Sequence, residues 1–131
     1  SLNVKSYYIG KSTFDYLVEV ESEEIVRALA PDFTRLSRVK TRGVIVTSRA
    51  TTPGFDFVSR FFAPAVGINE DPVTGSAHCC LGPYWQDKLK KNEMTAYQAS
   101  SRGGVIRLKM GRKDRITVSG QAVTVVRGEL L

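Results

Sequence analysis

The sequence has few of the side chains that build disulfide frameworks or metal centres. It contains two cysteines and one histidine in 131 residues, and His78, Cys79 and Cys80 are consecutive. Adjacent cysteines seldom reach disulfide geometry, so the sequence predicts no bridge and favours a reducing, cytoplasmic setting. Three consecutive side chains also lack the spacing that lets zinc ligands converge tetrahedrally on one ion. We therefore expect neither a disulfide nor a metal site.

Long apolar runs, internal repeats and linkers are missing as well. No apolar run approaches the roughly 20 residues that span a bilayer, which excludes a transmembrane protein and predicts no membrane partner. The sequence starts with neither a signal peptide nor a methionine, so Ser1 is interpreted as a trimmed or engineered start. No repeat and no linker divides the chain. The length predicts one domain, residues 1–131.

The charge balance is positive, with 19 Lys and Arg against 13 Asp and Glu, a formal net charge of +6. Such a surface attracts anions, which include small carboxylates, phosphates and nucleic acid. The basic residues fall in separate clusters at 35–42, 88–91 and 112–115, and no aromatic RNA-binding pattern or helix-turn-helix accompanies them. We expect no nucleic-acid partner, and we interpret the basic stretch 35–42 as covering a solvated edge.

The first half of the chain has the pattern of a hairpin followed by a short helix. Apolar residues alternate with polar ones on both sides of a break at residues 10–12, which predicts two antiparallel strands between Tyr7 and Val20. Ser22 and two glutamates predict the start of a helix that ends before Pro31. Residues 31–36 are predicted to be irregular. Strands are expected at 44–48 and at 55–62, the second at the centre of the sheet.

The second half predicts a central helix and a closing meander. Helical spacing begins at Ala77 and runs to Leu89, with Thr74 or Ser76 as the N-cap, and Pro83 is expected to kink or split this helix. Alternation then predicts strands at 106–110 and 116–118, and the strand-rich pattern extends to Arg127. The connections are too short for repeated βαβ crossovers. We therefore expect an α+β fold whose mostly antiparallel sheet is wrapped around the helix that follows Ser76.

The loop from Asp71 to His78 is the strongest candidate for a functional site. It is small, contains Gly75 and opens directly into the predicted helix, where free backbone N–H groups and the helix dipole attract a carboxylate or a phosphate. Asp71, Ser76 and His78 add an acid, a hydroxyl and a titratable ring. The alternative is an ordinary capped helix start.

Other chemistries at this loop are less favoured. His78 is the only histidine, and residues two apart on a helix point in different directions, so Ser76 and His78 make a poor nucleophile and base pair for a Ser-His-Asp triad. Cys79 or Cys80 near a helix start could be acidified, but a buried structural cysteine is the commoner arrangement.

A second candidate for anion binding lies at residues 100–104. Paired glycines, Gly103 and Gly104, let a ligand approach the backbone, and Arg102 can pair with a carboxylate. The alternative is a flexible loop before a strand.

The motifs together resemble one family. Residues 61–64 lead to the run GINEDPVTGSAH at 67–78, and residues 81–85 contain the proline that helix rules alone would not predict. Residues 98–104, 118–123 and 128–130 are similar to closing strands of the same family. In these stretches, which extend over nearly the whole chain, the sequence resembles the PhzF-like, or phenazine biosynthesis-like, proteins.

The resemblance implies a diaminopimelate epimerase-like fold. Such a protein has two similar halves, each a curved, mostly antiparallel sheet or half-barrel around a central helix, with a substrate cleft between the halves. This chain resembles the second, C-terminal half only. The family's proton-shuttling glutamate and Gly-His motif lie in the first half, and neither is present here.

Site roles follow from the same resemblance. Asp71 and Ser76 correspond to catalytic residues: Asp71 would polarise or exchange protons with a substrate group, and Ser76 with the helix start would hold the substrate carboxylate. The resemblance implies substrate contacts for Gly75 and Ser76, and the two candidate loops add Thr74, His78, Arg102 and Gly103 to the predicted substrate-binding residues. No metal, pyridoxal phosphate or nucleotide cofactor is implied.

Two hypotheses of different classes follow. The first is a PhzF-like isomerase domain that transfers protons, without a metal, on a small cyclic carboxylate, with a complementary N-terminal half or a second copy in a homodimer. The second is a catalytically inactive half-domain that binds a small anionic metabolite or a protein partner. A half-length site cannot by itself place an acid and a base across one substrate.

Overall fold

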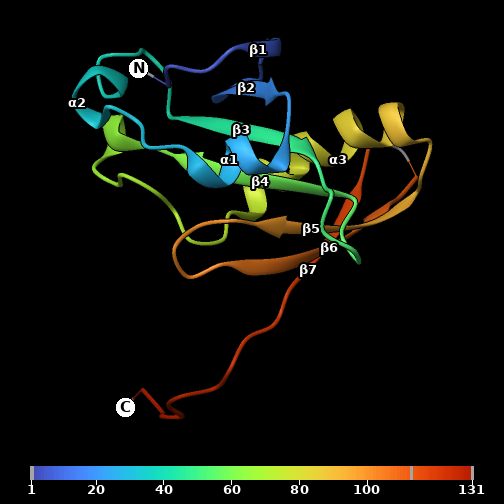
Figure 1. The fold of residues 1–131 in the computed structure, drawn as a ribbon. Helices are drawn as coiled ribbons and strands as arrows, with labels where there is room; N and C mark the ends of the chain where they lie inside the picture. The colour runs from blue at the N-terminus through green and yellow to red at the C-terminus, as the bar shows by residue number, and fades with distance from the viewer. Residues whose placement is uncertain (1, 113, 131) are drawn as a thin grey trace.

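The computed structural model describes residues 2–112 and 114–130, which form one seven-stranded sheet in sequential order (Figure 1). The strands are β1 (Ser6–Lys11), β2 (Asp15–Val20), β3 (Gly43–Arg49), β4 (Phe57–Phe62), β5 (Glu93–Gln98), β6 (Gly104–Met110) and β7 (Ile116–Ser119). The helices are α1 (Glu23–Ala28), α2 (Phe33–Leu36), the 3-10 turn η1 (Pro64–Val66) and α3 (Gly75–Leu89).

The sheet is mixed, and this corrects one expectation. Pairs β1–β2, β3–β4, β5–β6 and β6–β7 are antiparallel, as the alternating pattern predicts. Pairs β2–β3 and β4–β5 are parallel, with α1 and α2 in the first crossover and α3 in the second. The prediction that the connections are too short for βαβ crossovers is therefore wrong, whereas the α+β class and the central place of β4 are confirmed.

Helix α3 packs on one face of the sheet and supplies the centre of its core. Ala77, Leu81 and Trp85 are buried on one side of the helix, and the Trp85 Nε1 donates to Thr47 Oγ1 on β3 at 3.0 Å. The strand residues that share this cluster come from β2 through β6: Leu17, Ile45, Phe57, Phe61, Met94, Ala96, Ile106 and Leu108. The helix after Ser76 packs against the sheet as predicted, but the sheet is open and α3 lies on one face of it.

Helices α1 and α2 cover the opposite face (Figure 1). Ser22 caps α1 as predicted, because its Oγ accepts a hydrogen bond from the backbone N–H of Ile25 at 3.3 Å. The prediction that residues 31–36 are irregular is wrong for 33–36, which form α2. Asp32 Oδ1 accepts from the backbone N–H of Arg35 at 2.9 Å, which caps the single turn of α2, and Leu36 is buried.

Helix α3 continues across Pro83, so the predicted split is wrong. Proline removes the donor that would reach the carbonyl of Cys79. Cys79 lies on the exposed side of α3, where water can satisfy that carbonyl. Thr74 is the N-cap, one of the two residues predicted, and α3 ends at Lys90 in a left-handed conformation with a φ of 55°.

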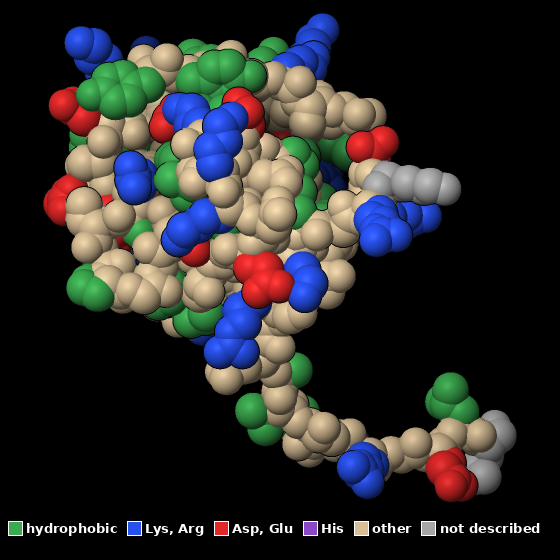
Figure 2. All heavy atoms as spheres, turned by 90° about the vertical axis from the view of Figure 1, so that its right-hand side faces the viewer, with side chains coloured by type: hydrophobic (Ala, Val, Ile, Leu, Met, Phe, Trp, Pro, Cys, Tyr) green, Lys and Arg blue, Asp and Glu red, His purple; other side chains and the backbone are tan. Residues whose placement is uncertain are grey.

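The strand pattern differs from the prediction at two places. Strand β5 was not predicted, and it lies between β4 and β6. Conversely, the strand-rich pattern to Arg127 does not give a strand: residues 120–130 have no regular structure and extend away from the sheet (Figures 1 and 2). Val123, Val125 and Val126 are 81–87% exposed, since no other described segment covers them.

No helix in the described ranges has the length and apolar character needed to cross a membrane.

The carboxylate of Glu23 joins α1 to the β3–β4 connection. It is buried and accepts hydrogen bonds from the backbone N–H groups of Thr51 and Thr52, at 2.7 and 2.9 Å, and from the Thr52 hydroxyl at 2.7 Å. Arg27 Nε donates to Glu23 Oε1, the oxygen that also accepts from the Thr52 hydroxyl, at 2.8 Å. Burial raises the pKa of Glu23, but the hydrogen bonds from Thr52, Thr51 and Arg27 outweigh it and lower the pKa from 4.5 to about 2.

Glu23 predicts a specific loss of stability in acid. A carboxylate whose pKa is lower in the native state stabilises the fold above pH 4.5, and this contribution disappears as the pH falls toward 2. Between these values, the unfolding free energy of the wild type should fall by on the order of 2 kcal/mol more than that of Glu23→Gln. Urea titrations at each pH measure this. Glu129→Gln, in the exposed tail, should follow the wild type, and parallel curves for all three proteins would contradict the prediction.

Candidate functional site

The loop that carries Asp71 is held rigidly where it leaves the sheet. The Arg60 guanidinium on β4 donates to both oxygens of Glu70, at 2.7 and 2.9 Å, and to the carbonyl of Leu29 at 2.7 Å. The backbone N–H of Asp71 donates to the carbonyl of Phe61 at 3.0 Å. Asp71 is therefore anchored to β4 before the loop turns into α3.

Gln98, at the end of β5, hydrogen-bonds the backbone at both ends of this loop. Its Nε2 donates to the carbonyl of Asp71 at 2.7 Å, and its Oε1 accepts from the backbone N–H of Thr74 at 2.8 Å. The side chain is fully buried, where unpaired polar atoms are costly, so both bonds are strongly favoured. Sequence reasoning assigned Gln98 no role. The alternation of apolar and polar residues that predicts a strand does not indicate that a polar residue at the strand end is buried and hydrogen-bonded.

The Asp71 carboxylate is oriented by Thr74. The Thr74 Oγ1 donates to Asp71 Oδ2 at 2.5 Å, and it makes no capping bond to the helix backbone. Within the part of the chain that the structure describes, no hydrogen bond reaches Asp71 Oδ1. One oxygen of a half-buried carboxylate is therefore held by the loop, and the other remains available to a ligand.

The start of α3 presents unused donors beside this carboxylate. Gly75 and Ser76 are exposed, and a Cβ placed on Gly75 would meet nothing within 4 Å. Among residues 2–112 and 114–130, no acceptor bonds the backbone N–H groups of Gly75 or Ser76. These groups carry the partial positive charge of the helix end, so the predicted geometry of an anion-attracting loop is present.

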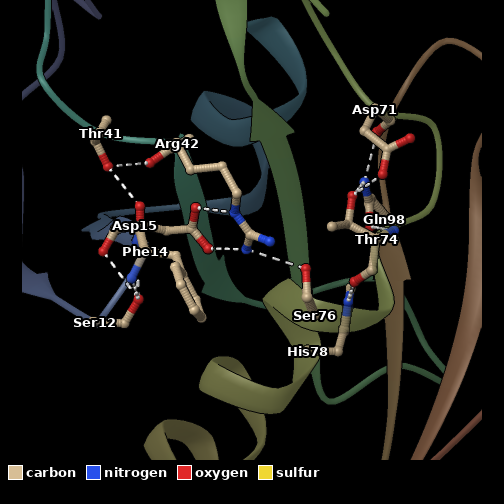
Figure 3. A network of polar contacts seen from close by, with 11 residues as sticks. Ser12, Phe14, Asp15, Thr41, Arg42, Asp71, Thr74, Ser76, His78 and Gln98 are labelled. Carbon is tan, nitrogen blue, oxygen red and sulfur yellow. Dashed lines mark hydrogen bonds and ion pairs between the residues drawn. The ribbon is translucent and has the colours of Figure 1, made fainter. Parts of the chain in front are cut away.

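Arg42, directly before β3, reaches this helix start, so the interpretation of the basic stretch 35–42 as a solvated edge is wrong at this residue. Arg35, Arg38 and Lys40 are exposed, as that interpretation predicts. Arg42 pairs through Nε and Nη2 with both oxygens of Asp15, which is buried on β2. The same Nη2 donates to Ser76 Oγ at 3.1 Å (Figure 3). Asp15 hydrogen-bonds the guanidinium and raises the pKa of Arg42. Sequence reasoning missed both residues because they are far from the loop in sequence.

His78 lies beneath the loop and is fully buried. Its Nδ1 is 2.8 Å from the carbonyl of Thr74, which can only accept, so Nδ1 carries the proton. In the neutral ring, Nε2 then accepts from the Ser59 hydroxyl at 3.3 Å. The side chains of Ser76 and His78 point in different directions, as expected (Figure 3). A direct contact of His78 with a ligand, which the sequence predicts, would require this ring to leave its partners.

The second candidate loop lies next to the first. Ser100 Oγ donates to the carbonyl of Pro72 at 2.8 Å and accepts from the backbone N–H of Gly103 at 3.0 Å. Gly103 has a φ of 71°, a region that favours glycine. Arg102 and Gly103 line a surface hollow together with Val73. The structure thus joins residues 100–104 to the loop of Asp71 as one surface.

The two thiols are unpaired, and they differ in exposure. Cys79 is exposed, so a buried structural role is wrong for this residue, whereas Cys80 is half-buried against the α3 core. Within the described ranges, no three His, Cys, Asp or Glu side chains are grouped to hold a metal ion.

Comparison with known proteins places this chain in a family. The family model described as phenazine biosynthesis-like protein matches residues 4–128. An uncharacterized isomerase of Halalkalibacterium halodurans is 58% identical over 130 residues, which cover 99% of this chain and 49% of that protein. A phenazine biosynthesis-like domain-containing protein of Homo sapiens is 45% identical over 95 residues, which cover 70% of this chain and 33% of that protein.

Solved structures agree with the sequence comparisons. A PhzF family protein of Enterococcus faecalis superposes with a TM-score of 0.82 and 38% identity over 92% of this chain and 47% of that chain. A PhzC/PhzF protein of Clostridium difficile gives the same TM-score and identity, over 91% of this chain and 45% of that chain. The chain belongs to the phenazine biosynthesis-like PhzF family, as its motifs indicate. It spans about half of the length of these bacterial relatives.

The buried histidine predicts a titration below the usual range. Burial lowers the pKa of His78 from 6.5, although the hydrogen bond to the Thr74 carbonyl raises it. Because the unfolded chain binds this proton at a higher pH, stability should fall as the pH drops below 6.5. Imidazole signals in proton NMR come from this one histidine. The midpoint should lie below 6.5 in the folded protein and close to it in urea. A folded midpoint at or above 6.5 would contradict the burial argument.

Proposed function

We propose that this chain is the C-terminal half of a PhzF-like isomerase that moves a proton on a small carboxylate without a metal or an organic cofactor. The observation that carries the proposal is the juxtaposition of Asp71, with one free carboxylate oxygen, and the unused N–H groups of Gly75 and Ser76. One loop thus offers a group that exchanges protons and a group that holds an anion. The isomerase names of bacterial relatives support the reaction class.

The proposed step balances within the substrate. Asp71 Oδ1 removes a proton from the carbon beside the substrate carboxylate, and the electron pair left behind spreads into that carboxylate. The N–H groups of Gly75 and Ser76 stabilise the charge that develops there. The proton then returns at the same carbon or, in an allylic substrate, two carbons away. Thr74 holds Asp71 Oδ2, so the free oxygen keeps its direction. Arg102 and Gly103 would bind the distal part of the substrate.

The proposed site is completed by a second half. We assign the whole protein a diaminopimelate epimerase-like arrangement in which a complementary N-terminal half, or a second copy of this chain, supplies the other wall and the opposite acid or base. Two features support an additional wall: Gly75 and Ser76 are exposed, and apolar side chains at both ends of the chain lack cover. Within the described ranges, the most exposed of these are Tyr7, Ile9, Phe14, Val123, Val125, Val126 and Leu130.

The proposed setting is the cytoplasm. The exposed Cys79 and the neighbouring Cys80 are both free thiols, which suits a reducing compartment.

Deuterium exchange tests the reaction. In heavy water, with cyclohex-2-ene-1-carboxylate as the probe, proton NMR should show enzyme-dependent loss of the signal from the carbon beside the carboxylate. Asp71→Asn should slow this loss by about 100-fold or more, and Ser76→Ala by about 10-fold or more. Asp87→Asn removes the same charge from an exposed ion pair at the far end of α3 and should retain the wild-type rate.

The outcomes separate the two hypotheses. Equal rates in wild type and Asp71→Asn would overturn the catalytic role of Asp71. No exchange by a wild-type chain that is dimeric in solution, combined with carboxylate binding, would instead favour the catalytically inactive half-domain that binds a small anion.

The native mass in solution tests whether two copies of this chain associate as a homodimer. Light scattering across a dilution series should give twice the monomer mass of 14.5 kDa, because association buries the exposed apolar side chains. The double variant Val123→Ser/Val125→Ser should shift the dissociation midpoint to at least about tenfold higher concentration, since each buried valine contributes about 1.5 kcal/mol or more. Thr124→Ser, in the same tail, is the control. A mass of 14.5 kDa at every concentration would contradict the homodimer and leave the complementary half as the partner.

A further inference from the structure

A contact between the residue that precedes β3 and the first turn of α3 sets the direction of one hydroxyl in the site. Arg42 lies 34 residues before Ser76 in the sequence, yet its Nη2 donates to Ser76 Oγ at 3.1 Å (Figure 3). The guanidinium has donors only and no acceptor. Ser76 Oγ must therefore accept in this bond.

The Arg42 side chain is held on several sides. The buried carboxylate of Asp15 accepts from Nε at 2.9 Å and also from Nη2, so the planar group is fixed by two parallel bonds. The rings of Phe14 and Phe61 lie 5.3 and 5.7 Å from the guanidinium carbon. Only 37% of the Arg42 side chain is exposed, against 70% for Arg35, which pairs on the surface with Asp32. Arg42 is therefore a fixed donor.

We propose that Arg42 is a positioning residue that makes the Ser76 hydroxyl a hydrogen-bond donor toward a bound carboxylate, and that Asp15 holds Arg42 for this purpose. An oxygen that already accepts from Arg42 directs its own proton away from the guanidinium, and Ser76 is exposed on the side of the helix start. The inference rests on the proposed function of Ser76 in holding a carboxylate.

The role differs from simple attraction by charge. The carboxylate of Asp15 balances the charge of Arg42, so the pair adds little net charge at the helix start. What Arg42 adds is a fixed direction for the O–H bond of Ser76. The effect of Arg42 on a carboxylate ligand should therefore depend on the presence of the Ser76 hydroxyl.

The free protein gives a first readout. In nitrogen-15 NMR at low temperature, Ser76→Ala should shift the guanidinium signals of Arg42, because the Nη2 partner is lost. Ser119→Ala, an exposed serine on β7, should leave them unchanged. Unchanged Arg42 signals in Ser76→Ala would overturn the contact on which the proposal rests.

Ligand binding gives the decisive readout, with benzoate as the probe and the backbone amides of Gly75 and Ser76 as reporters. Arg42→Met and Ser76→Ala should each raise the dissociation constant by about tenfold, which is typical of one hydrogen bond to a charged group. The double variant should lie within about twofold of either single variant, because both changes remove the same donated bond. Arg35→Met removes an exposed arginine and should change the constant by less than about twofold.

Several results would overturn the proposal. Additive losses in Arg42→Met/Ser76→Ala would show attraction independent of Ser76, and a wild type that does not bind benzoate would show no carboxylate site at this serine. Since Arg42→Met leaves Asp15 buried without its partner, Asp15→Asn/Arg42→Met is made in parallel, and circular dichroism checks that each variant folds. A loss of deuterium exchange alone would contradict the proposed reaction and not this inference, which is measured by binding.

Discussion

The burial of one side of α3 determines where the candidate site lies. Ala77, Leu81 and Trp85 face a core built by strands β2 to β6, and the indole of Trp85 also donates to Thr47 on β3. Because this packing fixes the helix along its length, the N-terminal turn is held next to the ends of β3 and β5. The free N–H groups of that turn are therefore a consequence of core packing and not of local loop chemistry alone.

Around this helix start, residues from four elements have distinct tasks. Gln98 from β5 satisfies the loop backbone, and Thr74 orients Asp71. Arg42, directly before β3, reaches Ser76 from the other side and is held by Asp15 on β2. This division explains why the surface is ordered although it is open. Buried Thr74 and Gln98 hold Asp71, and buried Asp15 holds Arg42, so these side chains lose little conformational freedom when a ligand binds.

Local patterns predicted a large part of the fold. Alternation located the strands on both sides of residues 10–12 and at 106–110, and Ser22 marked the start of α1. The same reasoning excluded βαβ crossovers and expected a kink or a split at Pro83; the crossovers are present, and the helix is not split. Periodicity describes one element at a time, whereas strand pairing and the tolerance of a proline depend on what packs against each element. The strand-like pattern of residues 122–127 has no described partner and stays extended in solvent.

For the site, the sequence by itself determined the loop from Asp71 to His78, its family and the residue types available for chemistry. These follow from neighbouring residues, whose spacing along the chain is set by covalent geometry. Only the tertiary structure decided that His78 is buried beneath the loop, that Gln98 closes it, and that Arg42 reaches Ser76. These contacts join residues 19 to 34 positions apart, and they form because the sheet and α3 bury a common core that brings distant side chains together.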